Sequence, residues 1–194
     1  MRKEKDSLGE KDIEDVYYGI HTARALENFN IKNKRVNEEL IKAIALIKIA
    51  AAEANKKAGK LDENIANAIK EAANDLIVGN YIDAFMLPSI QGGAGTSTNM
   101  CVNEVIANIA LEKMGHNKGD YQIISPLDHV NHSQSTNDVY PTAVKIASIK
   151  LLRELLDETM ALQQELQNKE KEFSNVLKTG RTQFQDAVPL TLGQ

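Results

Sequence analysis

The chain has 194 residues, with 23 lysines and arginines against 27 aspartates and glutamates, so its formal net charge is −4. Its hydrophobic share of 42% is enough to build a folded core, which excludes global disorder. The mildly acidic balance, without a basic cluster, argues against a nucleic-acid partner. A single cysteine, Cys101, excludes an internal disulfide framework and suits a reducing compartment.

The N-terminus, MRKEKDSLGEKD, lacks the apolar stretch of a secretory signal. No apolar run reaches the ~18 residues of a membrane span. We therefore expect a cytoplasmic protein with no membrane partner. Length alone allows one domain, or one domain and a fraction of a second.

Abundant Ala, Leu, Ile, Glu and Lys, with only four prolines, predict a mainly α-helical protein. The first thirty residues show no period and are predicted to be loop with a short strand. A first helix is predicted from Asn37, a capping residue, to Lys57, because apolar residues recur there at spacings of three and four. A second helix is predicted from Asp62 to a glycine cap at Gly79.

Two polar loops frame the next predicted helix. The first, residues 89–98, reads SIQGGAGTST, and its three glycines indicate unusual backbone angles or a close approach to another group. The helix is predicted from about Asn99 to Met114 and is ended by Gly115. The second loop, residues 117–140, is rich in His, Asn, Ser and Thr.

A long helix is predicted from Pro141 to Leu177, because proline suits a first helical turn and no further proline or glycine follows in that range. At about 1.5 Å per residue it would be a rod of roughly 55 Å. Such a rod normally packs in a bundle of equally long helices. The chain offers no second helix of that length, so the partners are expected in other subunits or in further sequence.

The tail is predicted to turn at Gly180 and to form a short strand between Thr182 and Leu192. We expect residues 1–140 to form an N-terminal helical domain. Residues 141–194 are expected to form the start of a long-helix bundle domain that is truncated in this chain.

Common catalytic and metal patterns fit the chain poorly. His129 and His132 are three residues apart, as metal ligands can be, but no matching Cys/His pair accompanies them, so no metal site is predicted. A triad of Ser133, His129 and Asp138 lacks the Gly-x-Ser-x-Gly elbow. The glycines of residues 92–95 lack the Gly-Lys-Ser/Thr ending of a phosphate loop.

Three polar segments remain, and each borders a predicted helix: residues 95–99, 133–138 and 180–183. Hydroxyls, amides and the N–H groups of helix N-termini bind carboxylates well. The same residue types are also the ordinary N-caps of helices. On spacing alone, helix capping and a carboxylate site are equally good interpretations.

Four long stretches in order along residues 7–194 carry a family resemblance: YYGIHTARALENF, QGGAGTSTNMCVNEVIANIALEKMGHNKGDY, DHVNHSQSTNDVYPTA and KTGRTQFQDAVPLTLGQ. Together they resemble the aspartase/fumarase superfamily. Within it, Thr136 and Gln183 match the branch that acts on aspartate, since class II fumarases typically carry serine and histidine there. Fumarases also have an accessory dicarboxylate site built on a His and an Asn, and those places read Ser125 and Leu127 here.

The resemblance implies the superfamily's mainly α fold: an N-terminal helical domain and the first long helix of the central bundle, with short β segments. It implies an anti elimination that converts L-aspartate reversibly to fumarate and ammonia through an enediolate. The expected partners are this small-molecule substrate and further copies of the chain, which form a homotetramer through the long helices. No cofactor is expected.

The resemblance also implies six substrate-binding residues: Thr96, Ser135, Thr136, Asn137, Thr182 and Gln183. The first three would bind the β-carboxylate, where negative charge develops. The two amides, Asn137 and Gln183, would receive the ammonium group, and Thr182 would hold the α-carboxylate.

In the superfamily the general base is a serine in a glycine- and serine-rich loop, which is expected beyond residue 194. No catalytic residue is therefore expected in this chain, which we interpret as an N-terminal fragment that is inactive alone. The superfamily also builds each site from three subunits. Two alternatives stay open: a class II fumarase, and a non-catalytic helical assembly fragment.

Overall fold

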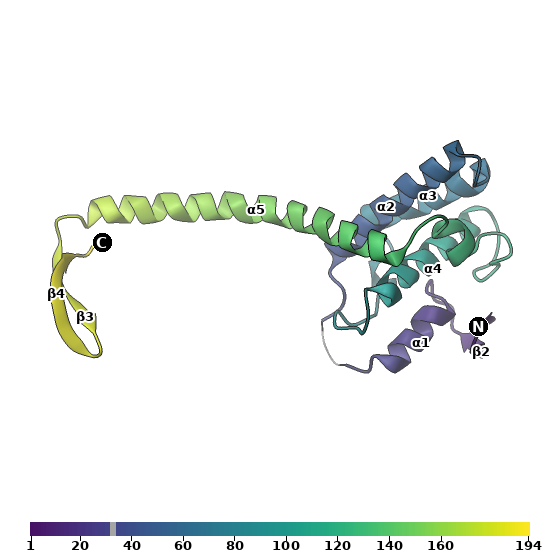
Figure 1. Ribbon diagram of the computed structural model, residues 1–194, viewed down its shortest axis with the longest axis horizontal. Coiled ribbons are helices and arrows are strands. Elements are labelled where there is room, and N and C mark those ends of the chain that lie inside the picture. The colour runs from purple at the N-terminus through teal and green to yellow at the C-terminus, as the bar shows by residue number, and fades with distance from the viewer. Residues whose placement is uncertain (32–33) are drawn as a thin grey trace. The chain divides into compact units, whose positions relative to one another are not determined.

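The computed structural model describes residues 1–31 and 34–194 and divides into two compact units, Met1–Ala147 and Ser148–Gln194. Figure 1 shows its elements in chain order. The described residues are mainly helical with four short strands, which confirms the predicted fold class. Among them, no helix has both the length and the apolar content that crossing a membrane requires.

A helical hairpin forms one part of the first unit's core. It consists of α2 (Glu38–Lys57) and α3 (Glu63–Ile77), which pack against each other (Figure 1). Asn37 caps α2 and Asp62 caps α3, each by accepting a hydrogen bond from a backbone N–H of the first turn. Gly79 follows the end of α3 with a positive φ of 93°. Both predicted helices and their caps are therefore confirmed.

The central helix of the first unit is α4 (Thr96–Lys113), which packs against α1, α2 and α3. Most of its side chains are buried, so it has no polar face and a weak amphipathic pattern. It begins three residues before the predicted start at Asn99, because Gly95 adopts a left-handed φ of 82° and leads directly into the helix. Its predicted end is confirmed by Gly115, which follows the helix with a φ of 80°.

The N-terminal segment is more regular than the sequence predicts. Strands β1 (Arg2–Asp6) and β2 (Gly9–Ile13) form an antiparallel hairpin, and α1 (Ile20–Asn28) follows. The prediction of loop with a short strand was wrong for β2 and for α1. Helix α1 has no side-chain cap from its own neighbours, so the local sequence carries no start signal.

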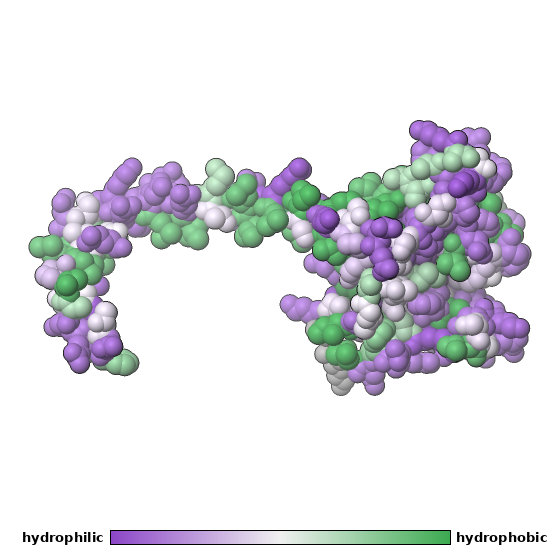
Figure 2. Space-filling view, viewed as in Figure 1, coloured by the Kyte–Doolittle hydropathy of each residue, from purple (hydrophilic) through white to green (hydrophobic). Residues whose placement is uncertain are grey.

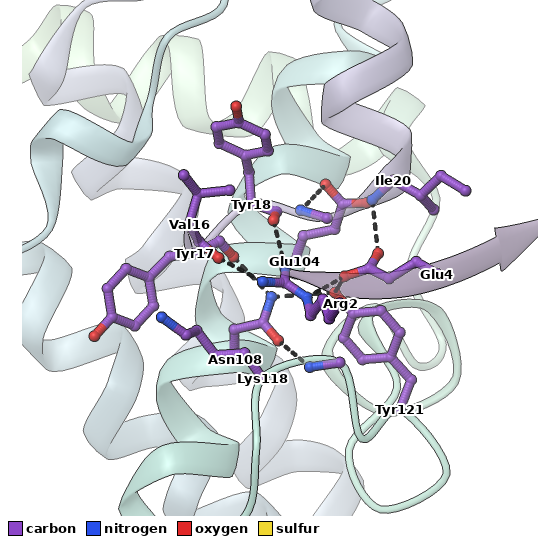
Figure 3. Close-up of polar contacts among 12 residues, drawn as sticks. Arg2, Glu4, Val16, Tyr17, Tyr18, Ile20, Glu104, Asn108, Lys118 and Tyr121 are labelled. Atoms are coloured by element: carbon purple, nitrogen blue, oxygen red, sulfur yellow. Dashed lines mark hydrogen bonds and ion pairs between the residues drawn. The ribbon is translucent and has the colours of Figure 1, made fainter. Parts of the chain in front are cut away.

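Distant carboxylates cap α1 instead (Figure 3). Glu104 of α4 accepts hydrogen bonds at 2.8–3.1 Å from three backbone N–H groups, those of Gly19, His21 and Thr22. Glu4 of β1 accepts the N–H of Ile20 at 2.7 Å. Burial raises the pKa of Glu104 to about 6, although these donors act in the opposite direction. The start of α1 is therefore specified by tertiary structure.

Two short helical turns lie in the loops of the first unit. They are η1 (Ile82–Ala84), a 3-10 turn, and η2 (Pro126–Val130), a π-helical turn that packs against α4. The loop predicted over residues 117–140 therefore contains a helical turn, and it ends at Ser135, directly before the next helix.

Helix α5 (Thr136–Glu172) is one uninterrupted helix, as predicted for this region. It begins five residues before Pro141, because Ser135 caps it by accepting the N–H of Asn137 at 3.2 Å. Pro141 lies inside the helix, where it has no N–H to donate to the carbonyl of Asn137. The predicted end at Leu177 was also wrong, because Leu177 pairs in a β-hairpin.

The second unit holds the C-terminal part of α5 and a hairpin of β3 (Leu177–Thr182) and β4 (Gln185–Thr191). The strand predicted between Thr182 and Leu192 corresponds to β4, whereas β3 was missed. Figure 2 shows apolar surface along α5. In this unit the exposed large apolar side chains of the helix are Ile149, Leu151, Leu152, Leu155, Leu156, Met160, Leu162 and Leu166.

Candidate active site

Two of the predicted substrate-binding loops meet in the first unit, at the starts of α4 and α5. Gly95, just before α4, lies against the ring of Tyr140 in α5, and a Cβ at residue 95 would collide with that ring. Gly95 also has a positive φ, so both the missing side chain and the backbone conformation favour glycine at this position. Thr96 and Thr136 are the first residues of the two helices that this contact brings together.

A hydrogen bond connects the two loops directly. The Nδ2 of Asn99, in the first turn of α4, donates to the Oγ1 of Thr136 at 2.9 Å. Because the hydroxyl oxygen accepts this bond, its O–H proton can be donated elsewhere. Asn99 is fully buried and Thr136 half-buried, so a buried amide orients the hydroxyl of a partly exposed residue.

Ser135 and Asn137 are exposed at the same helix start. The capping interpretation is confirmed for Ser135, whose Oγ accepts the N–H of Asn137. Capping uses the serine oxygen as an acceptor and leaves its O–H free to donate, so capping and carboxylate binding are compatible in this residue. Thr96 is exposed and is not a cap, because Gly95 occupies the cap position and has no side chain to offer.

A buried lysine lies beneath the second loop and was not predicted. Lys48 of α2 is fully buried, and its Nζ donates to the Oδ1 of Asn131 and to the Oε1 of Gln134, both at 2.9 Å. Burial lowers the pKa of Lys48 to about 7, and in the described part of the chain no acidic group offsets that effect. Gln134 and Ser135 also line a cavity of about 200 Å³ beside the loop.

The sequence did contain a signal for this residue. On α2, Lys48 falls on the buried side of the helix at the three- and four-residue spacing of Ile41, Ile44, Ala52 and Asn55. A lysine on an apolar helix face must find hydrogen-bond partners in the interior.

Amide side chains surround Lys48 in what we call the amide cluster: Asn99, Asn103, Asn131 and Gln134. The Oδ1 of Asn131 accepts hydrogen bonds at 2.9–3.2 Å from Lys48, Asn99 and Asn103. The Oδ1 atoms of Asn99 and Asn103 are buried without a partner among the described residues. The Nδ2 of Asn131 donates to the backbone carbonyl of Gln134, in a turn where Ser133 has a positive φ of 59°. The cluster therefore fixes the turn that precedes Ser135.

A second cavity, of about 660 Å³, is lined by Asp6, His21, Arg24 and Ser97 among others. The guanidinium of Arg24 donates to both carboxylate oxygens of Asp6, at 2.7 and 2.9 Å, and holds the pKa of that carboxyl below its usual value. The Nδ1 of His21 is buried without a partner in the part of the chain that is described, and burial lowers the pKa of His21. The charge of Arg24 is thus already paired.

Thr182 and Gln183 lie in the second unit, at the tip of the β3–β4 hairpin, and both are exposed. Thr182 pairs with Gln185, and the two residues between them, Gln183 and Phe184, have positive φ values of 50° and 60°. A two-residue turn of this kind normally uses Asn-Gly, so the present pair is strained. The other four predicted site residues belong to the first unit.

The two histidines of the second loop serve the structure of that loop. The Nδ1 of His129 accepts the N–H of Ser125 at 2.9 Å. A triad with Ser133 and Asp138 would need both ring nitrogens, and this bond already occupies one of them. The Nδ1 of His132 makes a hydrogen bond of 2.9 Å with the carbonyl of Asp128. In residues 1–31 and 34–194, no three His, Cys, Asp or Glu side chains are grouped as a metal site.

The fold and the arrangement of its loops are those of a known class. A family model described as Lyase matches residues 10–194, and the chain therefore belongs to this lyase family. It is 55% identical over 194 residues to an aspartate ammonia-lyase of Bacillus subtilis and 54% identical over 197 residues to one of Helicobacter pylori. Both matches cover 100% of this chain and 41% and 42% of the respective relative.

Solved structures agree with this assignment. A fumarate lyase:delta crystallin from Brucella melitensis has a TM-score of 0.92 and 50% identity, covering 100% of this chain and 44% of that one. A recombinant class II fumarase from Schistosoma mansoni has a TM-score of 0.87 and 37% identity, covering 99% of this chain and 41% of that one. The chain thus has an aspartase/fumarase-type fold and spans less than half the length of these relatives.

Proposed function

We propose that the chain is the N-terminal part of an aspartate ammonia-lyase, which converts L-aspartate reversibly to fumarate and ammonia. The observation that carries the proposal is its identity of 48% to 55% with aspartate ammonia-lyases, against 37% with the class II fumarase. Thr136 and Gln183, at positions where the two branches differ, support the same choice. The activity is proposed for the complete protein, since the chain spans about 42% of these relatives.

In the first step, a base removes a proton from Cβ, and the electron pair moves into the β-carboxylate to form an enediolate. The hydroxyls of Thr96, Ser135 and Thr136 would donate to this group. Donors that are already oriented stabilise the growing charge more than they stabilise the substrate. The hydrogen bond from Asn99 supports this role for Thr136, because it leaves the hydroxyl proton for the ligand.

In the second step, the electron pair returns to form the Cα=Cβ double bond, the C–N bond breaks, and ammonia leaves with the bonding pair. The amide oxygens of Asn137 and Gln183 would bind the ammonium group, and Thr182 would hold the α-carboxylate. The strained backbone of Gln183 supports a functional role, since such strain concentrates at active sites.

The base is proposed to be a serine in a loop beyond residue 194, so the 194-residue chain should be inactive alone. Proton removal needs a positioned base, and such help contributes about 10²–10⁴-fold. The loop would also close over the bound substrate and exclude water.

The complete protein is proposed to be a homotetramer. The exposed apolar side chains of α5 in the second unit support assembly through long helices. On this view residues 1–140 are the N-terminal domain and residues 141–194 begin the bundle domain. Sites that draw on three subunits would then combine Thr182 and Gln183 with residues of other copies. The single, buried Cys101 supports a cytoplasmic location.

One assay tests the function. Formation of fumarate is followed by its absorbance with the complete protein and with the 194-residue chain, each supplied with L-aspartate or L-malate. We expect turnover of aspartate by the complete protein only. Faster turnover of malate would identify a fumarase, and no turnover of either substrate would favour a non-catalytic assembly protein. Activity of the short chain that disappears in Ser135→Ala would place a base within it.

A further inference from the structure

We propose that Lys48 is a positioning residue of the carboxylate site: its buried charge holds the turn that presents Ser135 and Thr136, and it attracts negative charge to those hydroxyls. The inference rests on the proposed function, because it takes the ligand to be a dicarboxylate whose charge grows during the reaction. Lys48 acts through the amide cluster and does not itself contact the substrate.

One hydrogen-bond route from Lys48 reaches Ser135 through the backbone. Lys48 donates to the side-chain oxygen of Gln134, the residue directly before Ser135. The Nε2 of Gln134 donates in turn to the backbone carbonyls of Val130 and His132, at 2.9 and 3.2 Å. This one glutamine therefore ties the lysine to most of the turn that leads into α5.

A second route reaches the hydroxyl of Thr136. Lys48 donates to the Oδ1 of Asn131, which also accepts from the Nδ2 of Asn99 at 3.1 Å. The same Nδ2 donates to the Oγ1 of Thr136 at 2.9 Å. An amide nitrogen has two protons, so Asn99 can make both bonds at once. The position of the Thr136 hydroxyl thus depends on Asn99, and Asn99 and Lys48 both donate to the Oδ1 of Asn131.

The electrostatic balance of this region points to an anionic ligand. A buried ammonium group without a carboxylate is costly, and an apolar residue of similar size would pack there more cheaply. The amide oxygens of Asn131 and Gln134 solvate the charge but do not neutralise it. A dicarboxylate bound at Ser135 and Thr136 would supply the missing negative charge. Within about 10 Å, at an effective dielectric constant of about 20, one such interaction changes an equilibrium at least roughly tenfold.

The test compares the complete wild-type protein with two neutral variants, Lys48→Met and Lys48→Gln. Met keeps an unbranched side chain that is only one atom shorter, and Gln keeps a hydrogen-bond donor. The control is Lys42→Met, which removes a lysine from the same helix that is paired at the surface with Glu38. Each protein is assayed for kcat and KM with aspartate, for inhibition by succinate, and for its thermal midpoint, at a pH below the pKa of about 7, where Lys48 is charged.

We expect kcat/KM to fall at least about tenfold in both neutral variants, mainly through kcat, because the enediolate carries more negative charge than the substrate. Succinate should bind more weakly in both. The thermal midpoint should stay the same or rise, because a buried charge has been removed. Lys42→Met should stay within about twofold of the wild type in kcat/KM, as expected for a surface pair.

The possible failures are distinguishable. If the wild type does not turn over aspartate, the proposed function fails, and Lys48 is then judged by calorimetric binding of succinate alone. Succinate affinity that is absent, or equal in wild type and variants, overturns the Lys48 proposal. With an active wild type, the proposal is overturned if both variants match Lys42→Met in kcat/KM. It is also overturned if both variants lose the fold, because the lysine would then support the core rather than the site.

Discussion

The two units of the chain bury their apolar side chains to very different extents. In the first unit Leu111 of α4 has no exposed surface, whereas in the second unit Leu155 of α5 is 60% exposed. The first unit therefore builds its core from its own elements. The second unit is held by helix propensity and hairpin pairing, and it leaves an apolar surface for another surface to cover. A regular helix or hairpin therefore does not show that a segment has buried its apolar side chains in a core.

The polar groups differ in the same way. In the first unit Glu104, Lys48 and three asparagines of α4 are buried, and they join distant segments by hydrogen bonds. In the second unit the charged side chains of α5 pair with near neighbours, such as Lys169 with Glu172 at 2.6 Å. Contacts between neighbours along one helix contribute little to stability, whereas buried networks fix tertiary structure.

The largest expected difference comes from one substitution made in each unit. Leu111→Ala should lower the free energy of unfolding of the first unit by about 3–5 kcal/mol, because it leaves a cavity in a closed core. Leu155→Ala should change it by less than about 0.5 kcal/mol. All five tyrosines lie within residues 17–140, so tyrosine fluorescence during denaturation reports on the first unit alone. Equal effects would show that the first unit does not have a separate core.

A smaller effect is expected where α1 is capped by distant carboxylates. A Cβ at Gly19 would lie 2.6–2.8 Å from the side-chain oxygens of Tyr121, Glu104 and Glu4. Gly19→Ala should therefore cost about 2 kcal/mol of unfolding free energy, through crowding and weakened hydrogen bonds. The control is Gly92→Ala, whose Cβ would meet only two ring carbons of Phe29, at 3.5 and 3.9 Å, and should cost little. If both variants unfold at the same denaturant concentration, the tertiary cap does not stabilise the unit.

The smallest effect is a pH dependence confined to the first unit. The pKa of Lys48 is about 7 in the folded chain against an ordinary value of 10.5, so between these values the unfolded chain binds more protons and stability rises with pH. Burial raises the pKa of Tyr17, Tyr121 and Cys101, which lowers stability at higher pH, so about pH 7 to 9 is the useful window.

Across that window the wild type should gain up to about 2 kcal/mol relative to Lys48→Met, which has no amine to titrate. Lys169→Met is the matched control, because Glu172 raises the pKa of this exposed lysine of the second unit above the window. Its stability should follow the wild type at each pH. A parallel pH profile for Lys48→Met would show that Lys48 does not titrate there.

Local signals in the sequence predicted those parts of the fold that depend on local interactions. The caps Asn37 and Asp62 and the long helix α5 could be predicted because they depend only on residues that are close in sequence. Helix α1 was missed because its cap comes from Glu104. The start of α5 was misplaced because proline normally stands in the first turn of a helix, so Pro141 was a stronger local signal than the cap Ser135.

The candidate site divides in the same way. Its six residues were predicted from a family resemblance, since hydroxyls and amides at helix starts are also ordinary caps. The structure adds the parts that no local pattern contains: the contact of Gly95 with Tyr140 and the amide cluster around Lys48. These contacts depend on which segments meet in the folded chain. The sequence indicates only one part of them, because Lys48 falls at the spacing of the buried residues of α2.

The central claim is that the hydroxyls at the start of α5 bind the charge that develops on the substrate. The most direct measurement is kcat/KM for L-aspartate of the complete protein with Thr136→Val, beside Thr136→Ser as the variant that keeps the hydroxyl. Thr136→Val should lower kcat/KM by about 10²-fold or more, as expected for a lost oxyanion donor. Losing the partner of Asn99 should cost only about 1 kcal/mol of stability, and Thr136→Ser should retain most activity. A Thr136→Val protein that stays within about twofold of the wild type would contradict the account, since a lost oxyanion donor costs far more than that.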